Sequence, residues 1–212
     1  MAKSPKSVNL IGVNENNEKQ AFVFFGRSGS GKGTQAKLLI EHLLKTENKK
    51  SIYIETGEEL RDFVAESSHT SKIAKTVLDS GGLLPVFLPI WAWTNKIIKE
   101  YTGEEVLILD GLCRRPDEAI VLDSAMKFFK VKPTIIFIKT SFEWSYDRLK
   151  SRGRQDDSDE YIKSRLTWFD TKVFPAMAYF WGNQDYTFLE IDGERHIDEV
   201  HADILTKLAA TK

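Results

Sequence analysis

Residues 26–35 read Gly-Arg-Ser-Gly-Ser-Gly-Lys-Gly-Thr-Gln, and the short apolar run 21–25 comes directly before them. Glycines let the backbone adopt positive φ and come close to an anion, so that successive N–H groups point inward. Apolar residues then recur at helical spacing from Ala36 to Leu43, and the positive end of a helix that begins here would face the loop. The stretch therefore predicts a site for a nucleoside triphosphate on residues 26–34. The predicted triphosphate ligands are Gly29, Ser30, Gly31, Lys32, Gly33 and Thr34.

One position in this loop narrows the class of protein. The general phosphate-loop pattern places a serine or threonine directly after the lysine, where its hydroxyl binds magnesium. Here Gly33 has that position and Thr34 follows it. A GTPase would also need a guanine-reading Asn-Lys-x-Asp, whereas the only candidate, at residues 95–96, continues with two isoleucines. The loop therefore argues against a standard GTPase or motor ATPase. A flexible Gly/Ser linker, the other interpretation, rarely lies between an apolar strand and an amphipathic helix.

Four more apolar runs follow the loop and alternate with helical patterns. They cover Ser51–Glu55 and residues 106–109, 134–138 and 186–191. Strands that alternate with helices predict an α/β fold, with a P-loop NTPase-type parallel five-stranded sheet flanked by helices. Ligands bind beyond the carboxyl ends of such strands. We therefore expect the loops after the first four strands to converge on one site.

Bulk composition excludes several classes of function. The 212 residues suit one compact domain, and the formal net charge of -1 gives no bulk attraction to nucleic acid polymers or anionic membranes. The single cysteine, Cys113, excludes an intrachain disulfide and a zinc site built from cysteines. No apolar run follows the N-terminal lysines, so neither a signal peptide nor a membrane span is expected. We expect a cytoplasmic monomer with a polar N-terminal extension over residues 1–20 and a single domain over residues 21–212.

The Gly-Lys-Gly-Thr-Gln of residues 31–35 resembles the phosphate loop of the adenylate kinase-like nucleoside monophosphate kinases. Further signatures of that family follow in order. Residues 56–61, Thr-Gly-Glu-Glu-Leu-Arg, resemble its Thr-Gly-Asp-x-Leu-Arg segment, and residues 82–85, Gly-Leu-Leu-Pro, resemble its Gly-x-Leu-Val-Pro stretch. Residues 110–114, Asp-Gly-Leu-Cys-Arg, resemble its Asp-Gly-Phe-Pro-Arg. Residues 152–157 look like the family's short lid, and residues 163–166 look like the arginine-bearing helix after it.

The resemblance implies reversible transfer of the γ-phosphoryl group from Mg-ATP to a nucleoside monophosphate. The acceptor would bind in a helical subdomain over about residues 56–85, and a short lid over about residues 152–157 would exclude water. Arg148 and Arg152 would join the phosphate loop in binding ATP, and Asp110 would hold Mg2+ through water. The implied catalytic residues are Lys32, Arg114, Arg154 and Arg165. The implied acceptor-binding residues are Thr56, Gly57, Arg61, Leu84, Gly111, Arg114, Glu118, Arg154 and Arg165.

The chemistry explains why so many arginines are needed. Phosphoryl transfer requires the protein to position two anions and to neutralise the charge that develops between them. Planar guanidinium groups can hold phosphate oxygens bidentately. Direct in-line transfer requires no covalent intermediate, and no residue is placed as an obvious nucleophile.

The arginine-bearing helix has two features that the sequence predicts by itself. Arg165 lies at the edge of an apolar stripe that includes Ile162 and Phe169, so this arginine is expected close to buried surface. Pro175 predicts a kink or an end of the same helix near Phe174.

Four departures from the family pattern bear on function. Ser28 and Cys113 each stand where the family has proline, and the lid is shorter than the family's short form. Glu118 stands where adenylate kinases carry a glutamine that reads adenine. Glutamine can accept from the adenine amino group and donate to its ring nitrogen, whereas an ionised glutamate only accepts. Thr56 favours the adenine-type pocket by resemblance, so we expect AMP as the acceptor with weakened base fidelity; GMP, CMP or UMP are the alternatives.

Two other functions stay open at this point. One is a P-loop kinase for a small molecule that is not a nucleotide, against which Arg61, Arg114 and the lid pattern weigh. The other is a non-catalytic nucleotide-binding regulatory protein, which the departures at Ser28, Cys113 and Glu118 keep open.

Overall fold

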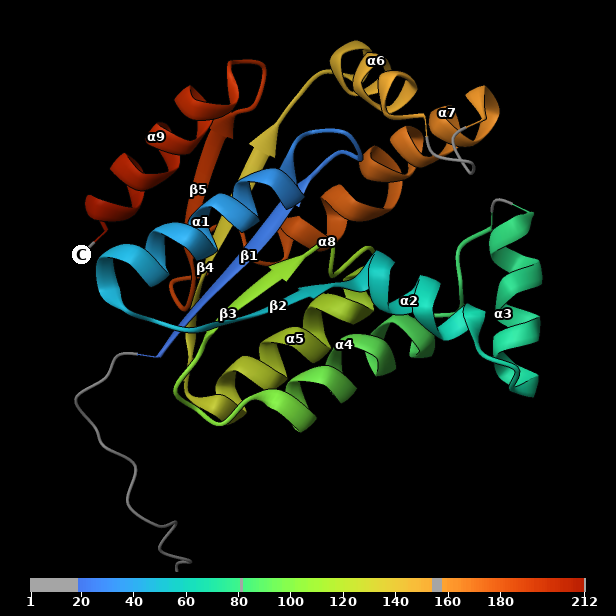
Figure 1. Ribbon diagram of the computed structural model, residues 1–212, viewed down its shortest axis with the longest axis horizontal. Coiled ribbons are helices and arrows are strands. Elements are labelled where there is room, and N and C mark those ends of the chain that lie inside the picture. The colour runs from blue at the N-terminus through green and yellow to red at the C-terminus, as the bar shows by residue number, and fades with distance from the viewer. Residues whose placement is uncertain (1–18, 81, 154–157, 212) are drawn as a thin grey trace, which may run out of the picture.

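The structure, a computed structural model, describes residues 19–80, 82–153 and 158–211. Its centre is a five-stranded parallel sheet in the order β2-β3-β1-β4-β5 (Figure 1). The strands are β1 Gln20–Gly26, β2 Ser51–Glu55, β3 Val106–Asp110, β4 Lys132–Lys139 and β5 Thr187–Asp192. They lie on the five predicted apolar runs, so the predicted α/β fold with a parallel sheet is confirmed. The strand that leads into the phosphate loop, β1, lies in the middle of the sheet.

Each face of the sheet is covered by its own set of helices, because side chains alternate along every strand. Val23 and Phe25 of β1 point into one core, and Phe22 and Phe24 point into the other. The face of Phe22 is covered by α1 Lys32–Glu47 and α9 Ile197–Ala209. The face of Val23 is covered by α4 Phe87–Glu100, α5 Pro116–Phe129 and α8 Phe174–Ala178. A parallel sheet with both faces buried in this way leaves the ends of its strands for ligands.

A third, smaller core lies beyond the carboxyl end of β2, where Figure 1 shows α2 next to the end of the strand and α3 farther from the sheet. It is built by α2 Thr56–Ala65, α3 His69–Asp79, the first half of α4 and Leu84 of the segment between α3 and α4. Leu60, Ala74 and Leu88 are among its buried residues. α2 follows β2 without a loop. The small core therefore lies next to the carboxyl ends of the strands, the same edge of the sheet from which the phosphate loop extends.

The helix that carries Arg165 is irregular. α6 Phe142–Arg152 and α7 Asp159–Trp168 pack together, after which α7 continues as the π-helical turn η1 Phe169–Val173 and then as α8. Pro175 lies in the first turn of α8. It has no N–H to donate to the preceding turn, so a regular α-helix cannot run through this point, and the wider π turn takes its place. The helix does not end near Phe174; instead it changes from π to α geometry between Val173 and Phe174.

Two predicted segments lie largely outside the residues that the structure describes. Residues 1–18 of the predicted N-terminal extension and residues 154–157 of the predicted lid lie outside the described residues. Within the described ranges, no helix has the length and the apolar character that crossing a membrane requires.

Candidate active site

A cavity of about 550 Å³ lies at the carboxyl ends of the strands, where the sequence predicts a site. The segments that follow each of the five strands contribute to its lining. Most of the predicted site residues are among those that line it: Gly29, Ser30, Gly31, Lys32, Gly33, Thr34, Gly57, Arg61, Asp110, Gly111, Arg114, Arg148, Arg152 and Arg165. The topology therefore brings together residues from distant parts of the chain around one space.

The phosphate loop has the backbone shape that anion binding requires. Gly29 and Gly31 have φ of 86° and 92°, a region that side-chain-bearing residues rarely adopt. A Cβ on Gly29 would also lie 2.7 Å from the carbonyl oxygen of Ser145 in α6, so the loop approaches α6 too closely for any side chain. α1 begins at Lys32 directly after the loop, which directs its free N–H groups into the cavity.

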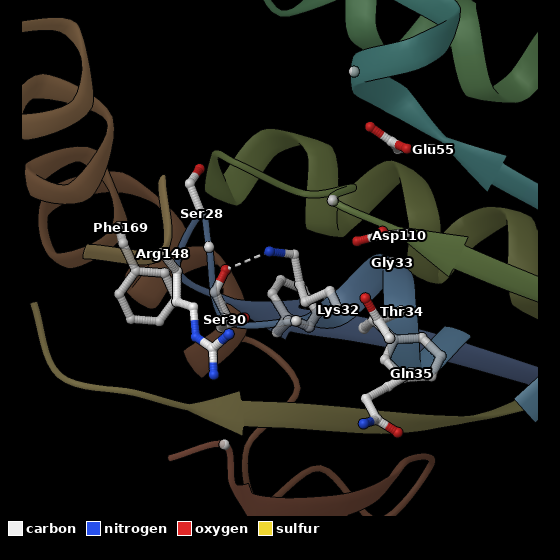
Figure 2. A pocket seen from close by; sticks show the side chains of 18 of the residues that line it. Ser28, Ser30, Lys32, Gly33, Thr34, Gln35, Glu55, Asp110, Arg148 and Phe169 are labelled. Carbon is white, nitrogen blue, oxygen red and sulfur yellow. Dashed lines mark hydrogen bonds between the residues drawn. The ribbon is translucent and has the colours of Figure 1, made fainter. Parts of the chain in front are cut away.

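Lys32 is held by the main chain of its own loop. Its Nζ donates to the carbonyl oxygens of Gly26, at 3.1 Å, and Arg27, at 2.9 Å. Figure 2 shows the lysine side chain turned back along the loop, close to Ser30 and Asp110. Burial lowers the pKa of Lys32, while the nearby Asp110 carboxylate raises it in opposition. An anion in the loop would favour the charged lysine and receive its hydrogen bonds.

Asp110, the last residue of β3, lies across from the start of α1. It is only 5% exposed; burial raises its pKa, which Lys32 opposes, and the Tyr53 hydroxyl donates to Oδ2 at 3.1 Å. A Cβ on Gly33 would lie 3.3 Å from that same oxygen. Glycine after the lysine therefore leaves space in front of the carboxylate, which a serine or threonine at this position would fill.

The donor set of this corner fits a hydrated magnesium ion. Asp110 and the hydroxyl of Thr34 are both oxygen ligands, and both line the cavity. No group of three or more His, Cys, Asp or Glu side chains suited to a metal occurs within residues 19–80, 82–153 and 158–211. Magnesium usually keeps several waters and binds through one or two carboxylates and the phosphates of a substrate, so it does not need such a group.

Two arginines converge on Gly57 at the other end of the cavity. A Cβ on Gly57 would lie 3.1 Å from Nη1 of Arg61 and 3.7 Å from Nη2 of Arg114. Glu55 lies beside them, and its Oε1 accepts from Nη2 of Arg61 at 3.1 Å. Glu55 and Asp110 are register partners at the carboxyl ends of β2 and β3, which places both carboxylates at one edge of the sheet. The missing side chain at Gly57 leaves these guanidinium groups facing the cavity, where they can bind an anion.

The cations of α6 and α7 line the remaining side. The Arg148 guanidinium lies over the ring of Trp144 at 4.9 Å, and both residues line the cavity. Nη2 of Arg165 contacts the Ser28 hydroxyl at 3.4 Å, so α7 touches the phosphate loop. Arg154, predicted to be catalytic, lies outside the described residues.

Comparison with known proteins now decides the family: the family model for adenylate kinase matches residues 24–185. The chain belongs to the adenylate kinase family. It is 31% identical to Adenylate kinase 1 of Synechocystis sp., over 85% of this chain and 92% of that protein. It is 31% identical to the adenylate kinase of Azobacteroides pseudotrichonymphae, over 87% and 94%, and 29% identical to that of Stenotrophomonas maltophilia, over 89% and 98%. At the level of the family it is an enzyme, a nucleoside monophosphate kinase.

Three residues that the family resemblance assigns to the acceptor are buried instead of lining the cavity. Thr56, Leu84 and Glu118 are 0%, 4% and 2% exposed, and none of them is among the lining residues. Thr56 Oγ1 and Glu118 Oε2 are buried and make no hydrogen bond to the described residues. Burial raises the pKa of Glu118, and Arg114 opposes that shift. The chain thus has two buried polar atoms without a hydrogen bond next to the acceptor residues Gly57 and Arg114, and neither atom is open to the cavity in this structure.

The two positions where the family has proline are accommodated differently. Ser28 uses its hydroxyl to contact Arg165, which a proline could not do. Cys113 is fully buried and has φ of 55°, a value that the proline ring, fixed near -65°, cannot reach. The turn before Arg114 therefore has a backbone conformation specific to a non-proline residue.

Sequence reasoning missed several residues at this site. Tyr53, Glu55 and Trp144 line the cavity, and Arg27 anchors the loop from behind. Tyr53 and Glu55 carried a usable signal: they are two residues apart at the end of a predicted strand, so alternation places them on one face, toward the predicted site. Trp144 lies one helical turn before Arg148, which also predicts a shared face.

Proposed function

We propose that this enzyme transfers the γ-phosphoryl group of Mg-ATP to a nucleoside monophosphate, with AMP preferred, so that ATP and AMP yield two ADP. One observation carries the proposal. The phosphate loop with Lys32 and the pair Arg61 and Arg114 line one cavity. Two anion-binding groups on one cavity suit a reaction between two phosphorylated molecules.

The donor end would bind the triphosphate on the loop residues, with Lys32 at the β and γ phosphates. Asp110 would hold a magnesium ion through water, and the bound ion would neutralise charge on the phosphate oxygens. Arg148 would stack on the base of ATP, as in the family, with the Trp144 ring behind it. These assignments follow from the family resemblance and from the position of each residue in the cavity.

The acceptor end would bind the phosphate of the monophosphate between Arg61 and Arg114. The geometry supports this because Gly57 leaves both guanidinium groups open to the cavity. Arg165 and, by the family resemblance, Arg154 would then stabilise the group in transfer. The predicted subdomain over about residues 56–85 would carry most of the acceptor contacts, and the predicted lid would exclude water.

The base of the acceptor would be read by Thr56 and Glu118. Both have a buried polar atom that makes no hydrogen bond to the described residues, and a nucleobase would supply the missing donors and acceptors. Neither residue lines the cavity, so this contact requires the acceptor subdomain to move when the nucleotide binds. Thr56 favours adenine by the resemblance. Glu118 can accept from the adenine amino group, but when ionised it suits the N1–H and amino group of guanine as well. We therefore propose AMP as the preferred acceptor and GMP as the strongest competitor.

A coupled assay for ADP formation tests this proposal directly. ATP is offered with AMP, GMP, CMP or UMP, and kcat/KM is measured for each acceptor. We expect the highest value for AMP and the next highest for GMP. A pyrimidine nucleotide as the best acceptor would overturn the base assignment. Tight ATP binding in calorimetry without turnover of any monophosphate would instead support a regulatory nucleotide-binding protein.

A further inference from the structure

Arg27 lies inside the phosphate loop, yet its side chain is directed away from the nucleotide cavity. It is not among the lining residues, although both of its neighbours in sequence are. Its guanidinium forms a bidentate pair with Asp170, with Nη1 at 2.9 Å from Oδ2 and Nη2 at 2.7 Å from Oδ1. Its side chain is only 15% exposed. A planar, paired guanidinium of this kind fixes both the distance and the angle between the segments that it joins.

The same guanidinium binds two main-chain carbonyl oxygens. Nε donates to Thr140 at the end of β4, and Nη1 donates to Leu166 in α7, both at 3.2 Å. The guanidinium also lies over the ring of Phe169 at 4.7 Å. One side chain therefore joins the phosphate loop, the end of β4, the last turn of α7 and the π turn η1.

The contacts of Arg27 with α7 and η1 lie next to Arg165, which lines the cavity. Leu166 follows Arg165 directly, and Asp170 lies in η1, where the helix changes from α to π geometry. Arg165 in turn reaches Ser28, the residue after Arg27. The loop and the helix are thus joined twice, through adjacent residues on each element.

We propose that Arg27 and Asp170 are positioning residues that hold the Arg165 side chain at a fixed place relative to the phosphate loop. This inference rests on the proposed function, in which Arg165 stabilises the phosphoryl group in transfer. Misplacement of a reacting or stabilising group by about 1 Å can reduce the rate by about 100-fold. The pair therefore acts on catalysis through Arg165, without touching either nucleotide.

The effect on folding stability is expected to be small. Asp170 is 56% exposed, and ion pairs with such a partner contribute little. α7 is also held by its own apolar contacts, in which Ile162 and Leu166 pack on Leu149 of α6. Loss of the pair should leave the helix folded while its angle to the loop becomes less restricted.

The test compares Asp170→Asn with the wild-type enzyme and with Glu190→Gln as a matched control. Glu190 pairs with Lys139 at 2.8 Å on the surface of the sheet and does not line the cavity. We expect D170N to lower kcat about 10-fold with both KM values changed less than about twofold, and its Tm to fall by less than about 4 °C. E190Q should change none of these quantities. Arg27→Lys, which keeps the charge but loses the planar fork, should resemble D170N.

A double-mutant cycle with Arg165→Lys separates positioning from general disruption. If the pair acts through Arg165, D170N causes little further loss of kcat in the R165K background. An equal loss in both backgrounds, a wild-type kcat in D170N and R27K, or a fall of Tm by more than about 10 °C in both variants would each overturn the positioning role. An inactive wild-type protein would overturn the proposed function and this inference together. An active wild type with unaffected variants would overturn this inference alone.

Discussion

The two ends of the cavity hold their cations in different ways. At the loop end, Lys32 is half-buried and donates to the main-chain carbonyls of Gly26 and Arg27. At the other end, the side chain of Arg61 is 47% exposed and pairs with the carboxylate of Glu55. An anion that arrives at Lys32 replaces neutral dipoles, whereas an anion that arrives at Arg61 replaces another anion. Binding at the loop end therefore adds a new ion pair with Lys32. Binding at the acceptor end replaces the ion pair between Arg61 and Glu55 with one between Arg61 and the ligand.

Mutations at the two ends of the cavity should therefore change different kinetic constants. Changes at the loop end should affect the chemical step most, because the backbone holds its cation in place before ligands arrive. Changes at the acceptor end should affect affinity and base choice, because that end depends on side chains that change partners.

The largest effect is expected from Lys32→Ala. We expect kcat to fall about 10³-fold, because the variant loses the charge that stabilises the transferred phosphoryl group. The fold should persist, because burial already disfavours the charged lysine and its removal leaves no unpaired cation. Steady-state kinetics and a thermal melt check both parts, with the exposed Lys45→Ala as a control. A near-normal kcat in K32A would contradict the difference between the two ends, because the loop end would then not determine the rate of the chemical step.

Arg61→Ala should show the opposite kinetic pattern. We expect the KM for AMP to rise about 10- to 100-fold, the value of one or two lost hydrogen bonds to a charged group. The KM for ATP should stay within about twofold, since Arg61 lies beside Gly57 and pairs with Glu55, and no contact of Arg61 with the phosphate loop is found among the described residues. Titration of each nucleotide at a saturating concentration of the other measures the two values. An equal rise in both would show that the two ends are coupled.

Glu118→Gln should sharpen base choice at the acceptor end. A neutral amide both donates and accepts, so it matches adenine better than guanine. We expect the ratio of kcat/KM for AMP over GMP to rise about 10-fold. Competition between the two acceptors in one reaction measures the ratio directly. An unchanged ratio would mean that Glu118 only supports the turn that carries Arg114.

The smallest effect is expected from Glu55→Gln, and it has the opposite sign. Removal of the carboxylate that pairs with Arg61 should lower the KM for AMP by about two- to fivefold, the value of a partly exposed ion pair. Glu59→Gln is the matched control, because Glu59 of α2 pairs with Lys96 of α4 at 2.6 Å and does not line the cavity. A higher KM in E55Q would show that Glu55 orients Arg61 for the acceptor instead of competing with it.

The sequence was sufficient for the sheet, the loop and most of the residues around the cavity. Strand and helix periodicity are local signals, and the phosphate loop follows from the glycines around Lys32. The contacts between Arg27 and Asp170, or between Arg61 and Glu55, depend on which way long side chains turn after the backbone is placed. The π turn likewise depends on the packing of α8 as well as on Pro175. Burial of Thr56 and Glu118 behind the arginine pair could not be predicted, because it depends on how the small core of α2 and α4 meets the sheet.

The π turn at Phe169–Val173 also sets a rotation along one continuous helix. Each residue of an α-helix rotates the chain by about 100° around the helix axis, and a π turn has more residues per turn than an α turn. Deletion of one residue here would remove the extra residue of the π turn and rotate everything beyond it relative to Arg165. Ala176 and Met177, both fully buried against the sheet side of the molecule, would then point elsewhere. The extra winding lets one helix present an arginine to the cavity and an apolar face to the core, at an angle that an uninterrupted α-helix would not give.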